Sequence, residues 1–273
     1  MKKITSVLLV MCMTIASKVY AEPWYDEDDL EWQLSIGAFY VNTKLPKLIG
    51  AKNEFSSLSP LVDAKIQYKQ FYLNTHSGDF FGGSDLGYQL IQEEDWGLDA
   101  IFGNYQIPFS DTGYYSNEDD KVEELKTINR RKVDQSIGLA YYQNVGEFLA
   151  VAELVYDVFG DSNGWVFHIE ATRNFELRNW DLWLNFGANY YSQNFNNYFY
   201  GVSPSEVNDY LYGFTAGDGA TAFVQTQVNY PVAQNWVYSA GASILVGSGG
   251  VKSSPLIDSN YARVFFTGVK YVF

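Results

Sequence analysis

The sequence predicts an all-β fold, a transmembrane antiparallel β-barrel of about 12 strands with short periplasmic turns and longer extracellular loops. Three observations lead to this prediction. Segments along the chain alternate between apolar and polar residues, the N-terminus has the pattern of an export signal, and the last strand ends on the aromatic residue Phe273. Aromatic residues make up 18% of the chain, as in barrels with aromatic girdles at the membrane interfaces.

Residues 1–21 have the pattern of a secretory signal peptide. Two lysines precede an apolar stretch over 4–16, which is shorter than the roughly 20 residues of a spanning helix, and small or apolar residues lead up to Ala21. We expect cleavage after Ala21. This step leaves residues 22–273 as a single outer-membrane barrel domain and removes Cys12, the only cysteine.

The remaining chain is strongly acidic. The segment before the cleavage site holds three of the 18 basic residues and none of the 32 acidic ones, so the rest carries a net charge of −17. Nucleic acid is excluded as a partner, since binding a phosphate backbone needs clustered Lys and Arg.

Twelve segments alternate as strands do, with one face apolar and aromatic. Many are close to the roughly 9–11 residues that cross a bilayer at a tilt. We expect strands over 32–42, 58–69, 71–76, 86–92, 96–107, 133–145, 148–157, 165–175, 180–194, 222–230, 236–247 and 262–273.

The connections alternate as well. Those after even-numbered strands are short turns, and those after odd-numbered strands are mostly longer, above all 108–132 and 195–221. Short turns on one side and long loops on the other are typical of bacterial outer-membrane barrels. A soluble sandwich or lipocalin-like barrel has the same alternation but gives no reason for the signal peptide or the aromatic placement.

Two loops contain helix signals. Ser203 and Glu206 have the spacing of a capping box, and Pro204 suits the first helical position, which predicts a short helix over 204–212. A weaker signal lies over 120–126.

The last strand resembles the C-terminal assembly signal of outer-membrane barrels. We expect its alternate residues Phe265, Val269, Tyr271 and Phe273 to face the lipid and to be recognised by the barrel assembly machinery.

A loop segment adds a more specific resemblance. Residues 197–206 contain Tyr200-Gly201-Val202-Ser203-x-x-Glu206, which resembles a motif of the MipA/OmpV family, and Ser254-Pro255-Leu256-Ile257 with the last strand resembles that family's C-terminal pattern. Val207 stands where the family usually has Ala. The resemblance implies a structural or scaffolding protein of the Gram-negative cell outer membrane, linked to a periplasmic lytic transglycosylase and a peptidoglycan synthase. It supplies no catalytic residues.

The sequence contains little that indicates a catalytic, metal or cofactor site. His168 alternates with Phe167 and Ile169, so it should face the lumen as a structural partner of Glu170, because a catalytic base needs a positioned nucleophile. No spacing suits a metal or a cofactor. We therefore expect no enzyme, cofactor or metal site, and lipid and lipopolysaccharide as the surroundings.

The inner face is predicted to be polar and mixed in charge. Ion pairs could fill it, or they could line a narrow channel. The polar or charged positions expected there are Asp63, Lys65, Asp99, Glu153, His168, Glu170, Asp181, Gln225, Gln227 and Lys270. A small-solute channel and a surface adhesin that uses the loops 108–132 and 195–221 are therefore alternatives to the scaffold.

Overall fold

The computed structural model describes residues 30–75, 83–114 and 121–273, with only the backbone of 83–85. The chain divides into two compact units, Met1–Leu30 and Glu31–Phe273. The expected signal peptide lies outside the described residues.

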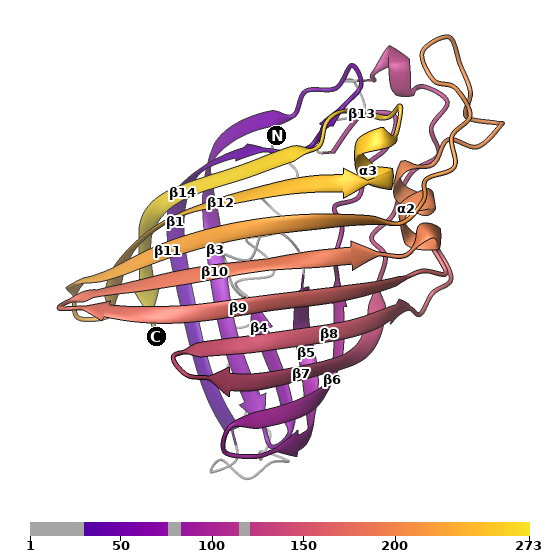
Figure 1. Ribbon diagram of the computed structural model, residues 1–273. Helices are drawn as coiled ribbons and strands as arrows, with labels where there is room; N and C mark the ends of the chain where they lie inside the picture. The colour runs from indigo at the N-terminus through magenta and orange to yellow at the C-terminus, as the bar shows by residue number, and fades with distance from the viewer. Residues whose placement is uncertain (1–29, 76–82, 115–120) are drawn as a thin grey trace, which may run out of the picture. The chain divides into compact units, whose positions relative to one another are not determined.

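The second unit is a closed antiparallel barrel (Figure 1), which confirms the predicted fold class. Twelve strands form its wall in the described part of the chain. Each expected strand is present, with shifts of a few residues at the ends. The strands are β1 (Leu30–Lys44), β3 (Glu54–Tyr68), β4 (Phe71–Thr75), β5 (Gly83–Gln92), β6 (Trp96–Asn104), β7 (Ser136–Val145), β8 (Phe148–Asp157), β9 (Trp165–Leu177), β10 (Trp180–Tyr191), β11 (Gly219–Ala233), β12 (Trp236–Gly249) and β14 (Tyr261–Val272).

Pairing of β1 with β14 closes the barrel, with Ser35 opposite Val272 and Lys44 opposite Arg263. A separate two-stranded sheet outside the wall pairs β2 (Lys47–Leu48) with β13 (Ile257–Ser259). Among the described residues, no helix is both long enough and apolar enough to cross a membrane.

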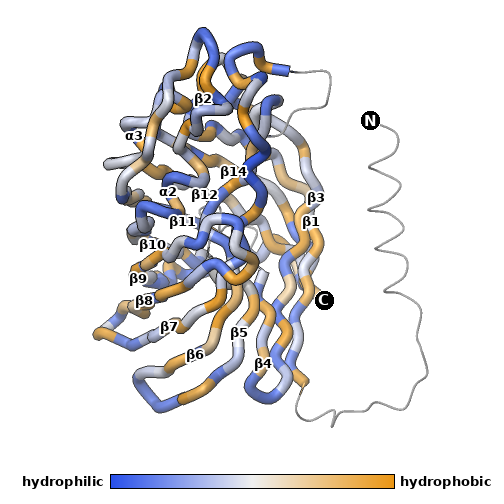
Figure 2. Tube along the Cα trace, turned by 90° about the vertical axis from the view of Figure 1, so that its right-hand side faces the viewer, coloured by the Kyte–Doolittle hydropathy of each residue, from blue (hydrophilic) through white to orange (hydrophobic). Residues whose placement is uncertain are grey.

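The two faces of each strand carry the expected side chains. Along β8, Leu154 and Tyr156 are exposed and Glu153 and Val155 are buried. Figure 2 shows hydrophobic and hydrophilic residues alternating along the strands. The exposed apolar face points away from the barrel axis and suits lipid, because an outer-membrane barrel has an outward apolar band.

Short turns join the strands at one end, four of two residues and one of three, at 93–95. Lys69, Gly146, Arg178 and Asn235 take positive φ there, between 54° and 65°. Turns of this kind match the right-handed twist of paired strands. Three tryptophans, Trp96, Trp180 and Trp236, open strands at this end, where interfacial aromatics are expected.

The helices gather at the opposite end of the barrel (Figure 1). These are α2 (Gln193–Tyr200), α3 (Gly250–Ser253) and the 3-10 turn η2 (Glu123–Leu125). The turn η2 lies within the weaker helix signal over 120–126, of which Asp120 is outside the described residues.

The predicted helix over 204–212 is wrong. Residues 204–206 form a single turn, with the Glu206 N–H donated to the Ser203 carbonyl. The side chain of Asn208 then accepts the N–H groups of Tyr210 and Leu211, at 2.8 and 2.9 Å. A helix cannot continue here because the Asn208 side chain binds the two N–H groups that a helix would pair with its own carbonyl oxygens.

Candidate functional site

The long loops fold inward and pack against the barrel wall at the end opposite the tight turns. Their apolar side chains join inward-facing residues of the strands, such as Ile101, Val155 and Val166, in one buried cluster. We call the loop part of this cluster the loop plug. Its largest fully buried side chains include Leu48, Leu125, Phe195, Phe199, Leu211 and Leu256. Burial of this much apolar surface makes the closed arrangement the stable one.

Helix α2 brings aromatic residues into the plug. Phe195 and Phe199, four residues apart, lie on one helix face with ring centroids 5.0 Å apart, and Tyr191 stacks on Phe195 at 5.1 Å. The helix ends at Gly201, where a Cβ atom would stand 2.4 Å from the carbonyl oxygen of Asn197. Only glycine allows this close approach, so the glycine of the family-like motif has a steric reason.

A buried ion pair joins two loops beside this helix. Arg131 donates from Nη1 to Glu206 Oε1 at 2.8 Å and from Nη2 to Oε2 at 3.1 Å. The exposed fractions of the two residues are 7% and 2%. Arg131 Nη2 also donates to the Gly201 carbonyl at 3.0 Å. A bidentate pair in this environment fixes both the distance and the angle between the loops.

Glu206 receives further hydrogen bonds from both sides. The Ser203 N–H and hydroxyl each donate to Oε2 at 2.9 Å, and the Asn129 N–H donates to Oε1 at 2.9 Å. The Thr127 hydroxyl donates to the Glu206 carbonyl at 2.6 Å. Of the two reciprocal capping-box contacts, only the one from the Ser203 N–H to the Glu206 carboxylate forms, and it closes a loop instead of starting a helix.

These contacts also set the charge state of the pair. Burial by itself raises the pKa of Glu206, but hydrogen bonds from Arg131, Ser203 and Asn129 outweigh it and lower the pKa from 4.5 to about 2. The carboxylate is ionised at any physiological pH and remains the counter-ion of Arg131.

A pair of carboxyl groups, Asp134 and Asp157, lies just before β7 and at the end of β8. Asp157 accepts the N–H groups of Phe159, Ser162 and Asn163, which shapes the β8–β9 loop. Neighbouring Asp134 is buried and accepts the Ser162 hydroxyl at 2.5 Å. Burial of the Asp134 carboxyl raises its pKa from 3.8 to about 7.

Polar side chains fill the outer half of the lumen. His168 Nδ1 lies 2.7 Å from Asn189 Oδ1, and its Nε2 lies 3.6 Å from Glu170 Oε2, as its inward position predicts. Tyr105 donates to Glu153 at 2.5 Å. Lower in the barrel, Lys270 pairs with Asp63 at 2.8 Å. The residues expected on the inner face thus include ion pairs and hydrogen-bonded groups.

The structure separates the residues of the family-like loop motif from those of the predicted assembly signal. Tyr200, Val202 and Glu206 are buried in the plug, and the exposed Ser203 turns its hydroxyl onto Glu206. Phe265 and Val269 of β14 and Phe273 just after it are 47%, 40% and 59% exposed. Tyr271 lies between Trp236 and Phe273, with ring centroids at 5.3 and 4.9 Å.

Arg131 is the residue that sequence reasoning missed. It stands between Arg130 and Lys132 in a loop of mixed charge, so its residue type gives no signal of a structural role. The 75-residue separation from Glu206 gives no indication that they pair.

Comparison with known proteins relates this plugged barrel to a family. The model of the family described as MltA-interacting protein MipA matches residues 34–273, which is most of the chain. The chain belongs to the MipA family. Within it, YiaT of Escherichia coli (strain K12), named as an outer membrane protein, is 28% identical over 88% of this chain and 91% of its own length.

Two further likenesses are more distant. The MltA-interacting protein of Escherichia coli (strain K12) is 24% identical over 59% of this chain and 65% of its own length. Among solved structures, in-vitro folded OmpT, an outer membrane protein of Vibrio cholerae, is 9% identical, with a TM-score of 0.40, over 94% of this chain and 100% of that one. Family and fold together make the MipA-family chain an integral barrel of the cell outer membrane.

Proposed function

We propose that this MipA-family barrel is a scaffold of the outer membrane, which presents its periplasmic turns to enzymes of the cell wall. One observation carries the proposal: at the outer end, loop residues pack into one buried cluster with inward-facing wall residues, and the buried pair of Arg131 with Glu206 joins two loops. Loops packed in this way favour a structural role over solute diffusion. The name of one relative, an MltA-interacting protein, supports a lytic transglycosylase as the partner class. The peptidoglycan synthase in this proposal comes from the family resemblance of the sequence alone.

We infer a non-enzymatic role for the same barrel. Both ring nitrogens of His168 are engaged by Asn189 and Glu170, so the histidine has no nucleophile to activate. In this proposal the chain is processed after Ala21, the barrel assembly machinery inserts residues 22–273, and lipid with lipopolysaccharide surrounds the wall.

Site-specific photo-crosslinking tests the scaffold. A photoreactive residue replaces Lys69, Arg178 or Asn235 in the periplasmic turns, and Asp209 in an extracellular loop is the matched control. We expect crosslinks to a lytic transglycosylase or a peptidoglycan synthase from the turns and none from position 209. Turn positions that capture neither enzyme, in cells that contain both, would contradict the scaffold.

Exposed aromatic residues at the outer end favour a second candidate function, a surface adhesin. Phe159, Tyr210 and Tyr212 are 71%, 49% and 62% exposed at loop tips, whereas Leu211 between the two tyrosines is buried in the plug. Aromatic side chains on a rigid support are typical binding anchors. Replacing the three with serine should lower attachment to a host surface and leave the plug intact. Unchanged attachment would remove this candidate.

A further inference from the structure

Two positively charged side chains face each other where the barrel closes, at the end that carries the long loops. Lys44, the last residue of β1, is directly opposite Arg263 of β14. Side chains that are directly opposite in an antiparallel pair are close neighbours, and like charges in such positions destabilise the pairing. An anion between the two cations would remove this repulsion.

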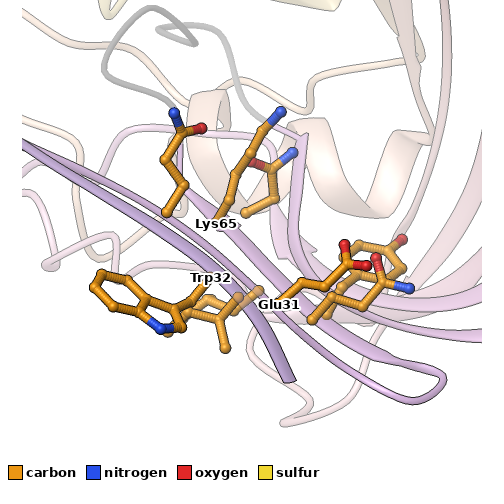
Figure 3. Close-up of a pocket in the computed structure, with 9 residues that line it drawn as sticks. Glu31, Trp32 and Lys65 are labelled. Carbon is orange, nitrogen blue, oxygen red and sulfur yellow. The ribbon is translucent and has the colours of Figure 1, made fainter. Parts of the chain in front are cut away.

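The Lys44 side chain lies on the outer face of the wall. Figure 3, a close-up at the periplasmic end, shows Trp32 and Lys65 on opposite sides of the strands. Trp32 is on the outer side and is 59% exposed, and Tyr40, farther along β1, is 45% exposed. Lys44 follows Tyr40 by four residues in a ladder of unbroken register, and alternate side chains share a face. Lys44 therefore points outward.

Arg263 points outward as well. Its side chain is 46% exposed, whereas its neighbours on the strand, Ala262 and Val264, are buried. Phe265, two residues farther along β14, is exposed on the same face as Arg263. The two cations therefore share one outward surface, and the register of β1 with β14 brings them together.

The pair lies at the outer edge of the membrane. Trp32, near the start of β1, is at the periplasmic interface, where tryptophans are enriched. Lys44 stands twelve residues farther along the strand, which is about 40 Å at the rise of a β-strand. At the usual strand tilt this length spans about 30 Å across the membrane, whereas the apolar band of such barrels is about 25 Å tall. Lys44 and Arg263 therefore lie just beyond the acyl chains, at the depth of lipid phosphates.

Glu54, at the start of β3, compensates only one of the two charges. Arg263 Nη2 donates to Glu54 Oε1 at 2.8 Å, and the two side chains are about half exposed. Lys44 adds a second positive charge near the same carboxylate. A guanidinium has five N–H donors, so Arg263 keeps donors for another acceptor. The cluster has a net positive charge and suits an anion with several acceptor oxygens.

Polar and aromatic groups adjoin this cluster on the same face. The Asn42 amide, two residues nearer the membrane centre than Lys44, donates to the Ser56 hydroxyl at 2.8 Å. Phe265 is directly opposite Asn42, and both Phe265 and Tyr40 are exposed toward lipid. From the rim inward the surface changes from cationic to polar to aromatic. This is the order of phosphate, sugar and acyl chain in a phosphorylated glycolipid.

We propose that Lys44 and Arg263 bind a phosphate of an outer-leaflet glycolipid, the lipid A part of lipopolysaccharide. The phosphate lies between the two cations, the sugar lies against Asn42, and the acyl chains pack on Tyr40 and Phe265. Inorganic phosphate would satisfy the same charges but would leave the aromatic side chains uncovered, so we favour the glycolipid. The site is at the opposite end from the periplasmic turns and is independent of the scaffold role.

Native mass spectrometry of the delipidated protein, purified from outer membranes in detergent, tests the site. The probes are bisphosphorylated lipid A, its dephosphorylated form and inorganic phosphate, all in EDTA so that no divalent cation bridges carboxylate and phosphate. We expect one bisphosphorylated lipid A to be retained in preference to the dephosphorylated form. Lys44→Gln and Arg263→Gln should each weaken its retention about fivefold, the effect of one basic residue near an anionic membrane surface.

Glu54→Gln should have the opposite effect, because it removes the carboxylate that competes for Arg263. Lys252→Gln, in the exposed part of α3 at the same end of the barrel, is the matched control and should change nothing. Heat-modifiable migration confirms that each variant is folded. Equal retention of the two forms of lipid A, or retention that neither Lys44→Gln nor Arg263→Gln weakens, would overturn the proposal. Retention that Glu54→Gln does not increase, or displacement of lipid A by equimolar inorganic phosphate, would also overturn it.

Discussion

Replacing Glu206 with alanine should open the loop plug without unfolding the barrel. The substitution leaves the Arg131 guanidinium buried with no counter-ion, and it also frees the N–H groups of Ser203 and Asn129. Removing one partner of a buried pair costs about 3–5 kcal/mol. The strand ladders do not involve these groups, so the loops should bear this cost.

Hydrogen exchange measures the effect directly. The Asn129 amide and the Val202 amide, which donates to the Phe214 carbonyl at 2.8 Å, both report on the closed plug. A loss of 3 kcal/mol corresponds to about 100-fold faster exchange, because each 1.4 kcal/mol is a factor of ten. Exchange in the strands should remain unchanged, and the variant should conduct ions in a planar bilayer where the wild type does not.

Three control variants distinguish the contribution of the Arg131–Glu206 pair to plug stability from that of neighbouring groups. Ser203→Ala removes one hydrogen bond to the carboxylate and should cost about 1–2 kcal/mol. Glu123→Ala breaks an exposed pair with Lys126 and should have almost no effect. Arg131→Met combined with Glu206→Leu removes both charges and should restore most of the protection. Loop amides of Glu206→Ala that exchange at the wild-type rate would refute the reasoning.

Four further predictions follow from named groups. Gly201→Ala should speed exchange of the Val202 amide, because its Cβ meets the Asn197 carbonyl at 2.4 Å; wild-type exchange would contradict this. The Glu206 pKa is lowered, so plug protection should be complete above about pH 4.5 and decline toward pH 2; a loss already at pH 6 would implicate another group. Burial raises the Asp134 pKa to about 7, so ionisation disfavours the closed β8–β9 loop at higher pH; Asp134→Asn should raise the protection factors of Ser162 and Asn163 about tenfold at pH 8 and little at pH 4. Phe273→Ala should slow membrane insertion and leave protein in the periplasm, as fractionation and heat-modifiable migration would show; normal insertion would exclude an assembly role.

Much of the wall is predictable from local pattern. Alternation along 148–157 predicts which residues of β8 face the lumen, since a strand's side chains can only alternate, and the structure agrees for Glu153 and Leu154. The same rule correctly puts His168 beside Glu170. Strand ends were less predictable, as at β3, which begins at Glu54 where alternation alone suggests residue 58.

The loop structure could not be predicted from local sequence pattern. Ser203 and Glu206 have the spacing of a helix start, and the Ser203 N–H donates to the Glu206 carboxylate. The helix nevertheless lies before them, at Gln193–Tyr200. Propensity and capping describe only neighbours in sequence, whereas Arg131 reaches Glu206 from another loop.

The sequence by itself predicted the strands, their alternating faces and the end with short turns, because these follow from a period of two and from the lengths of the connections. The export signal and the aromatic placement added the membrane. The tertiary structure alone decided that the long loops pack together at the outer end of the wall. This packing depends on Arg131 and Glu206, 75 residues apart, and on apolar residues of several loops that meet only when the wall brings them together.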